Sequence, residues 1–229
     1  MIKWNKKFVY PTSTRSLIDD QRHYSINNEK LPSVTTILQA TQSEEKKASL
    51  AKWKQNIGEN KAEFIKNEAA ERGSIMHRVL ESHLLGHRHA DFSDLGQQAG
   101  VMANTILESG IRGHLEEIWG SEITVYYPEL YAGATDLAGI YEGRESIIDF
   151  KQSNKLKRKE WIEDYFVQLA AYAMAHNQMH GTKIQSGTIL MCTKDNQFQR
   201  FDIKDQEFQR FSWQWLKKID EFYEKKKNL

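Results

Sequence analysis

The chain has 229 residues, of which 39% are hydrophobic, and its formal net charge at pH 7 is +1. This length suffices for a substantial apolar core, and we expect residues 1–229 to form a single domain. The small net charge excludes a global field that attracts anions, so any nucleic-acid surface has to come from local clusters of lysine and arginine. One cysteine, Cys192, excludes an internal disulfide.

The N-terminal residues lack an apolar stretch long enough for a signal peptide, and no window resembles a membrane span. Asp19 and Asp20 count against a mitochondrial presequence, which is normally poor in acidic residues. We therefore expect a cytoplasmic protein, from a bacterium or a phage-infected host, that does not associate with membranes. A location in the mitochondrial matrix is the less favoured alternative.

The first 120 residues are predicted to be mostly helical. A short hairpin with its turn at "NNEK" precedes a helix that Ser33 can cap. Residues 44–71 have apolar side chains at helical spacing, which predicts a long helix or a pair broken at Gly58. A further helix is expected after Gly73, in "SIMHRVLESHLLG", and it is followed by one from about 94 to 119.

From about residue 121 the hydrophobic period changes. The segments "EITVYY", "YAGATDLAGIYE" and "ESIIDFK" are short and rich in β-formers, so we expect three consecutive antiparallel strands. An apolar helix ending near Gly181, a strand pair and an amphipathic helix follow. The predicted fold class is α/β, or α+β: residues 121–229 form a core with a mixed central sheet flanked by helices, and residues 1–120 form a helical elaboration.

Two acids and an amine lie on neighbouring predicted strands. Alternation along a strand places Asp149 and Lys151 on one face, with Phe150 on the other, while Asp136 comes from the adjacent strand. Two close carboxylates repel each other unless a cation lies between them, and oxygen ligands favour Mg²⁺ or Mn²⁺. A divalent ion beside a lysine predicts phosphodiester hydrolysis.

At these residues the sequence resembles the PD-(D/E)XK nuclease superfamily, which implies a restriction-endonuclease-like core. "GATDLAG" and "IIDFKQS" look like its second and third motifs, "VQLAAYAMA" like the Gln-x-x-x-Tyr helix of the RecB-like branch, and "GSIMHRVLE" like the histidine motif of that branch. "LPSVTTILQAT" and "WIEDYFVQLAAYAMAHNQ" are similar to mitochondrial genome maintenance exonucleases and related phage and bacterial exonucleases. The similarity extends from about residue 22 to the C-terminal helix, and four motifs in order distinguish it from a chance triplet.

The resemblance implies a role for each matching residue. Asp136 and Asp149 would bind the metal, with His77 and the carbonyl of Phe150 as further ligands, and Lys151 would be the catalytic amine. The remaining implied roles belong to residues around this set: Gln168 in catalysis, and Tyr172, Ser153 and Asn154 in DNA binding. Glu81 shares a helical face with the histidine and could orient the imidazole. The basic run after this set, with Lys155, Lys157 and Arg158, indicates either a DNA-binding edge that follows the phosphates or an ordinary solvated loop.

Some acids and histidines stay outside this set. Glu122 and Glu129 are both candidates for an acid on the first core strand, and neither is included because neither is clearly aligned. Taken singly, an aspartate in a small-residue run is more often a capping residue, and a histidine beside an apolar stripe is more often a core residue. His83, His87 and His89 could suggest zinc, but without a cysteine or a second cluster a solvated helix end is favoured.

Together these features predict a Mg²⁺- or Mn²⁺-dependent DNA exonuclease, a hydrolase of DNA replication, recombination or repair. Its partner would be single-stranded DNA with a free end, because the helices before the sheet could form an arch that confines a strand beside the metal. Two alternatives are a structure-selective endonuclease on the same core and a non-catalytic DNA-binding accessory protein of recombination.

Overall fold

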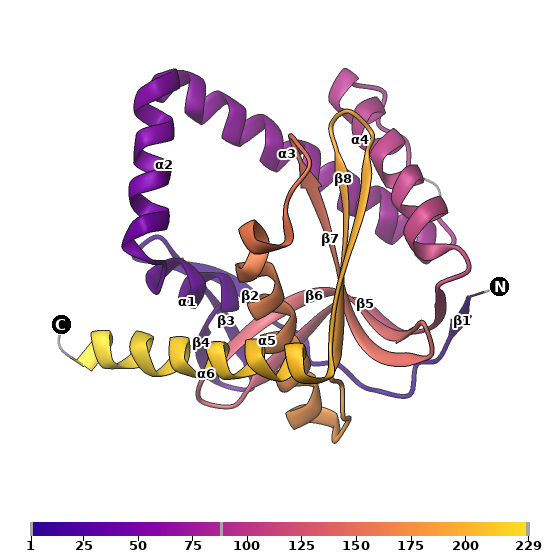
Figure 1. Ribbon diagram of the computed structural model, residues 1–229. Coiled ribbons are helices and arrows are strands. Elements are labelled where there is room, and N and C mark those ends of the chain that lie inside the picture. The colour runs from indigo at the N-terminus through magenta and orange to yellow at the C-terminus, as the bar shows by residue number, and fades with distance from the viewer. Residues whose placement is uncertain (1, 88, 228–229) are drawn as a thin grey trace.

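The computed structural model describes residues 2–87 and 89–227. A six-stranded mixed sheet in the order β1-β5-β6-β7-β8-β9 forms its centre (Figure 1). The β1/β5 and β7/β8 pairs are parallel and the other pairs are antiparallel. The strands are β1 (Lys3–Trp4), β5 (Leu115–Tyr127), β6 (Tyr131–Tyr141), β7 (Arg144–Ser153), β8 (Ser186–Thr193) and β9 (Phe198–Lys204).

Helices cover both faces of this sheet, so the predicted mixed sheet flanked by helices is confirmed. On one face pack α1 (Val34–Ala40), α5 (Glu163–His180), which follows a 3₁₀ turn (Lys159–Ile162), and α6 (Asp205–Lys227). On the other pack α3 (Glu59–Leu84) and α4 (Asp94–Ile106). Within the described parts of the chain, no helix is both long enough and apolar enough to cross a bilayer.

A second, three-stranded antiparallel sheet precedes α1. Its strands are β2 (Thr14–Ile18), β3 (Gln21–Ile26) and β4 (Glu29–Pro32). The predicted hairpin is confirmed, and its turn residues Asn27 and Asn28 both have positive φ, which asparagine tolerates better than most residues. Ser33 caps α1 as predicted, because the amide of Thr36 donates to its Oγ at 3.0 Å. Neither β1 nor β2 was predicted.

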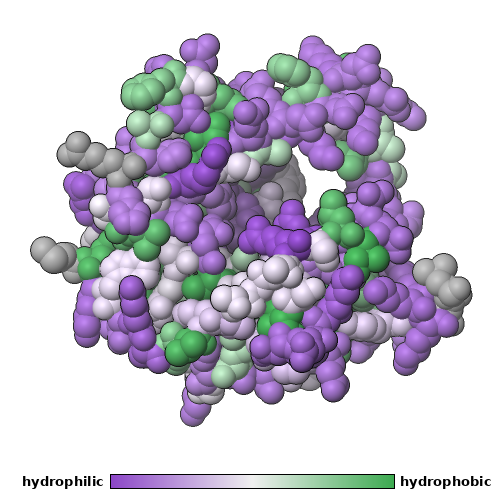
Figure 2. Space-filling model, turned by 180° about the vertical axis from the view of Figure 1, so that it is seen from behind, coloured by the Kyte–Doolittle hydropathy of each residue, from purple (hydrophilic) through white to green (hydrophobic). Residues whose placement is uncertain are grey.

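An arch rises from the body beside the central sheet. It consists of α2 (Glu44–Ile57) and the first half of α3, with Gly58 at the bend as predicted and a φ of 86° there. No residue of α2 is buried, and the space-filling view shows an opening beneath the arch (Figure 2). Lys46 at the start of α2 pairs with Asp164 of α5 at 2.8 Å, which ties the foot of the arch to the body.

Two helix boundaries differ from the prediction. Helix α3 continues through Gly73, where a side chain would crowd Gln152 of β7 at 3.1 Å, so the glycine permits close packing and does not end the helix. The helix predicted from about 94 to 119 is wrong in its second half: α4 ends at Ile106, a π-helical turn covers Leu107–Ile111, and β5 then begins. Pairing with β6 overrides the helical spacing of the apolar residues there.

Candidate active site

A cavity of about 600 Å³ is enclosed by α3, the strands β5 to β7, α5 and the small sheet. Its lining includes most of the residues that the sequence analysis selected. These residues are His77, Glu81, Asp136, Asp149, Phe150, Lys151, Gln168 and Tyr172. The sheet and helices therefore bring together side chains that are up to 95 positions apart in the sequence, from position 77 to position 172.

The two strands β6 and β7 place the acids and the lysine. Asp136 comes directly before Leu137, the first residue of β6 that pairs with β7, and its Oδ2 accepts a hydrogen bond of 2.6 Å from the amide of Phe150. Asp149 and Lys151 point into the cavity and form an ion pair, whereas the Phe150 ring packs in the opposite core. The predicted alternation along β7 is confirmed. Both aspartates are buried, with 8% of Asp136 and 3% of Asp149 exposed.

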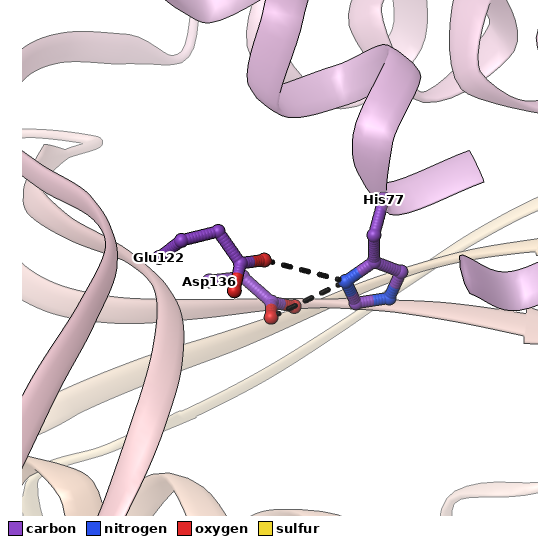
Figure 3. A group of neighbouring side chains, drawn as sticks. All are labelled: His77, Glu122 and Asp136. Carbon is purple, nitrogen blue, oxygen red and sulfur yellow. Dashed lines mark ion pairs between the residues drawn. The ribbon is translucent and has the colours of Figure 1, made fainter. Parts of the chain in front are cut away.

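A nitrogen and two carboxylates converge above the sheet (Figure 3). The Nδ1 of His77, from α3, lies 3.3 Å from Oδ1 of Asp136 and 3.8 Å from Oε1 of Glu122. One ligand atom from each of these three residues lies within 4.8 Å of the others. Across the described residues this is the one group of histidines, cysteines or acids so arranged, and its imidazole and carboxylate donors fit a divalent cation.

Glu122 therefore completes a cluster from which the sequence analysis omitted it. It lies on β5 opposite Asp136, between the paired positions Ser121–Leu137 and Ile123–Thr135. Its φ is +52°, and like charges face each other across the strands, two features that are unfavourable in an ordinary sheet and typical of functional sites.

Counting outward from the turn after Pro128 would have found this pairing in the sequence. Tyr127 and Tyr131 face each other on either side of the turn, and the pairing continues outward from them one residue at a time on each strand. This count places Glu122 opposite Asp136. Glu129, the other candidate acid, lies within the turn itself, where its amide donates to Glu29.

The charges of the cluster balance one another. Burial alone would lower the pKa of His77, but Asp136 and Glu122 reverse this effect and raise it to about 10. Burial opposes ionisation of Asp136, yet His77 and Lys151 hold the pKa of that carboxyl below its usual value. Burial raises the pKa of Asp149 to about 6, although Lys151 partly offsets the effect. A bound cation would replace the proton on His77, because imidazole ligates metals in its neutral form.

The amine of Lys151 is held in its charged form. Burial acts to lower its pKa, but Asp149 and Asp136 have the larger combined effect and raise it. Its Nζ also lies 4.9 Å from the centre of the Tyr165 ring, within the range of a cation–π contact. The lysine is therefore placed to offset negative charge and to donate hydrogen bonds.

Helix α5 supplies the polar pair beside the lysine. The Nε2 of Gln168 donates to the Oη of Tyr172 at 2.8 Å, one helical turn away. Tyr172 packs over Gly133 of β6, where any side chain would overlap its ring. The glycine in the small-residue run thus lets α5 approach the sheet, and it fixes the tyrosine against the cavity wall.

The residues predicted to bind DNA at the end of β7 and on the segment after it do not line this cavity. They are Ser153, which ends β7, and Asn154, Lys155, Lys157 and Arg158. The Oγ of Ser153 is already hydrogen-bonded within the same segment: it donates to the carbonyl of Lys155 and accepts from the amide of Lys155. Asn154 accepts a hydrogen bond from Arg72 of α3. Glu81 does line the cavity, where burial and the charge of Glu122 raise its pKa.

Comparison with known proteins shows which sequences and structures the chain is similar to. No protein-family model matches the chain. Mitochondrial genome maintenance exonuclease 1 of Mus musculus is 31% identical over 219 residues, and the protein of that name from Homo sapiens is 29% identical over 212 residues. The chain is homologous to mitochondrial genome maintenance exonuclease 1. The resemblance predicted from the motifs is thereby confirmed.

These alignments cover 89% and 86% of this chain but only 62% and 60% of the mouse and human proteins. The chain thus spans about three fifths of the length of these relatives. Among solved structures, a candidate exonuclease from Eubacterium rectale has a TM-score of 0.45 at 14% identity, covering 65% of this chain and 63% of its own. An alkaline exonuclease from Laribacter hongkongensis has a TM-score of 0.32 at 15% identity, covering 67% and 82%.

Proposed function

We propose that the protein is a metal-dependent DNA exonuclease that hydrolyses phosphodiester bonds from the ends of single-stranded DNA. The observation that carries this proposal is one cavity lined by the His77–Glu122–Asp136 cluster and the Asp149–Lys151 pair. Homology to an exonuclease supports the reaction class. The proposed cation is Mg²⁺ or Mn²⁺, and the biological setting is DNA replication, recombination or repair.

In this proposal His77, Glu122, Asp136 and Asp149 hold the cation, with the carbonyl of Phe150 as a further ligand. The bound ion would polarise a phosphoryl oxygen and lower the pKa of bound water. Its positive charge would also relieve the repulsion between the carboxylates and an approaching phosphate.

The remaining residues act on the substrate and the water. Because the pKa of Lys151 is raised, we assign its ammonium group to donating a hydrogen bond to the scissile phosphate or the attacking water and to offsetting transition-state charge. The hydrogen-bonded pair Gln168–Tyr172 would orient these partners from α5. Asn154, Lys155 and Arg158 lie on the segment after β7, where they would contact the strand outside the cavity.

The arch supports a requirement for a strand end. Helices α2 and α3 frame an opening (Figure 2). Ala69, Ala70 and Gly73 of α3 belong to the wall of the catalytic cavity. A single strand with a free end would reach the cation through this opening, whereas a circle could not thread it, because the arch is a continuous chain that packs on the body through α1 and α3. The predicted cytoplasmic location stays a prediction.

The test is a time course of cleavage on single-stranded oligonucleotides labelled at either end, with a circular single strand in parallel. Wild-type protein is expected to shorten the linear strands with Mg²⁺ or Mn²⁺ and to do nothing in EDTA. Lys151→Ala is expected to lose at least 100-fold in rate, because a charge aimed at the transition state is removed. Lys183→Ala, at an exposed position outside the cavity, is the matched control. Equal cleavage of the circle would indicate an endonuclease, and no cleavage at all would indicate a binding protein.

A further inference from the structure

Two arginines of the small sheet form part of the catalytic cavity. Arg15 of β2 and Arg22 of β3 line it together with Tyr24. Arg22 and Tyr24 are two positions apart on one strand, so their side chains share a face, and Arg15 pairs with Tyr24 across the strands. The Arg15 guanidinium carbon lies 5.5 Å from the centre of the Tyr24 ring. The small sheet therefore presents a basic surface to the cavity.

Buried tyrosines connect this surface to the catalytic residues. Tyr24 is 3% exposed and lies close enough to Tyr172 to raise its pKa further, beyond the larger effect of burial. Tyr172 in turn accepts the hydrogen bond from Gln168. The arginines, the two tyrosines, the carboxylates and Lys151 thus line one cavity of about 600 Å³, which has room for more than one phosphate of a strand.

The two guanidinium groups have no acidic partner in the parts of the chain that the structure describes. Neither takes part in an ion pair there, although fifteen such pairs are present. The acids of the cavity come from elements other than the small sheet, namely α3 and the strands β5 to β7: Glu81, Glu122, Asp136 and Asp149. Both arginines are exposed, so their donors are free to bind a planar or tetrahedral anion.

We propose that Arg15 and Arg22 form a second phosphate subsite, which binds a phosphate of the same nucleic-acid strand whose scissile phosphate lies at the carboxylate cluster. This inference rests on the proposed function and adds a fixed anchoring point for the substrate. The ligand is a phosphate group, either the terminal monoester of the strand or an internal diester. The subsite holds the strand in position, and it takes no part in bond cleavage.

The experiment compares Arg15→Gln/Arg22→Gln with Lys30→Gln/Lys204→Gln, which removes the same charge from exposed lysines outside the cavity. Binding of single-stranded oligonucleotides with a 5′-phosphate, a 5′-hydroxyl or a 3′-phosphate is measured by fluorescence anisotropy in EDTA over a range of salt concentrations. We expect the arginine variant to bind about 10- to 100-fold more weakly than the lysine variant. The slope of log affinity against log salt should fall by about 0.7 for each phosphate that the protein no longer neutralises.

A loss confined to one phosphorylated end would identify the terminal monoester as the ligand, and an equal loss on all three strands would identify an internal diester. Equal affinities and equal salt slopes for the two double variants would overturn the proposal, as would the absence of DNA binding by wild type. Cleavage with Mn²⁺ is assayed separately. An arginine-dependent affinity without any cleavage by wild type would refute the hydrolytic function and leave the phosphate subsite standing.

Discussion

Replacing Arg72 with methionine is expected to lower the free energy of unfolding by about 3 kcal/mol. The guanidinium is 1% exposed and joins α3 to three other segments. It donates to Glu68 at 2.7 Å, to Gln98 of α4 at 3.2 Å, to Gln152 of β7 at 3.2 Å, and to Asn154 in the segment that follows. Methionine keeps most of the apolar stem, so the change isolates the polar interactions.

The expected loss in the free energy of unfolding can be estimated from the hydrogen bonds that the four acceptors of Arg72 lose. A hydrogen bond to a charged group contributes about 1.5–3 kcal/mol, so four independent bonds would contribute about 6–12 kcal/mol. The Glu68 side chain is 41% exposed and the amide partners are half-buried, so water can replace part of what the guanidinium supplied. The net loss therefore falls at the lower end of the roughly 3–5 kcal/mol that accompanies removal of one member of a buried pair.

The assay is urea unfolding followed by circular dichroism, with Lys66→Met on the exposed side of α3 as the matched control. With a slope of about 2–3 kcal/mol per molar urea, the Arg72 variant should unfold at a midpoint roughly 1 M lower. The control should stay within about 0.5 kcal/mol of wild type. Arg72→Lys should recover less than half of the loss, because an ammonium cannot reach partners in four directions. A loss below about 1 kcal/mol for Arg72→Met would refute the reasoning.

Three further outcomes are expected. Glu122→Gln should weaken Mn²⁺ binding at least tenfold by titration calorimetry, since one carboxylate ligand is lost, while Glu129→Gln should bind as wild type does; equal affinities would remove Glu122 from the cation site. Gly133→Ala should lower stability by about 1–3 kcal/mol, because the added methyl group displaces the Tyr172 ring; an unchanged melting temperature would contradict this packing. Burial lowers the pKa of His176 to about 3. Below about pH 6.5 this histidine is therefore protonated in the unfolded chain but not in the folded one, and the free energy of unfolding decreases as the pH is lowered. Between pH 7 and pH 5 wild type should lose about 2 kcal/mol more than His176→Gln, and parallel stability profiles would show that His176 is not buried neutral.

The central sheet could be predicted from local patterns. Residues 121–153 are rich in β-branched and aromatic side chains and are divided by turn residues, so the strand positions follow from composition, and the faces follow from the two-residue period of a strand. That period alone places Asp149 and Lys151 on one side and Phe150 on the other, as the structure has them. The helix that was wrong, from about 94 to 119, failed because apolar residues at helical spacing also fit a strand buried on both faces.

The sequence by itself determined the two acids, the lysine, the Gln-x-x-x-Tyr helix and the family resemblance, because these depend on identity and short-range spacing. Only the tertiary structure decided that His77 of α3 meets Glu122 and Asp136, and that Arg15 and Arg22 belong to the same cavity. Such proximities depend on strand register and on how separate layers pack, and neither leaves a periodic signal along the chain. A side chain far away in sequence enters a site through long-range packing, and that packing exists only after the chain has folded.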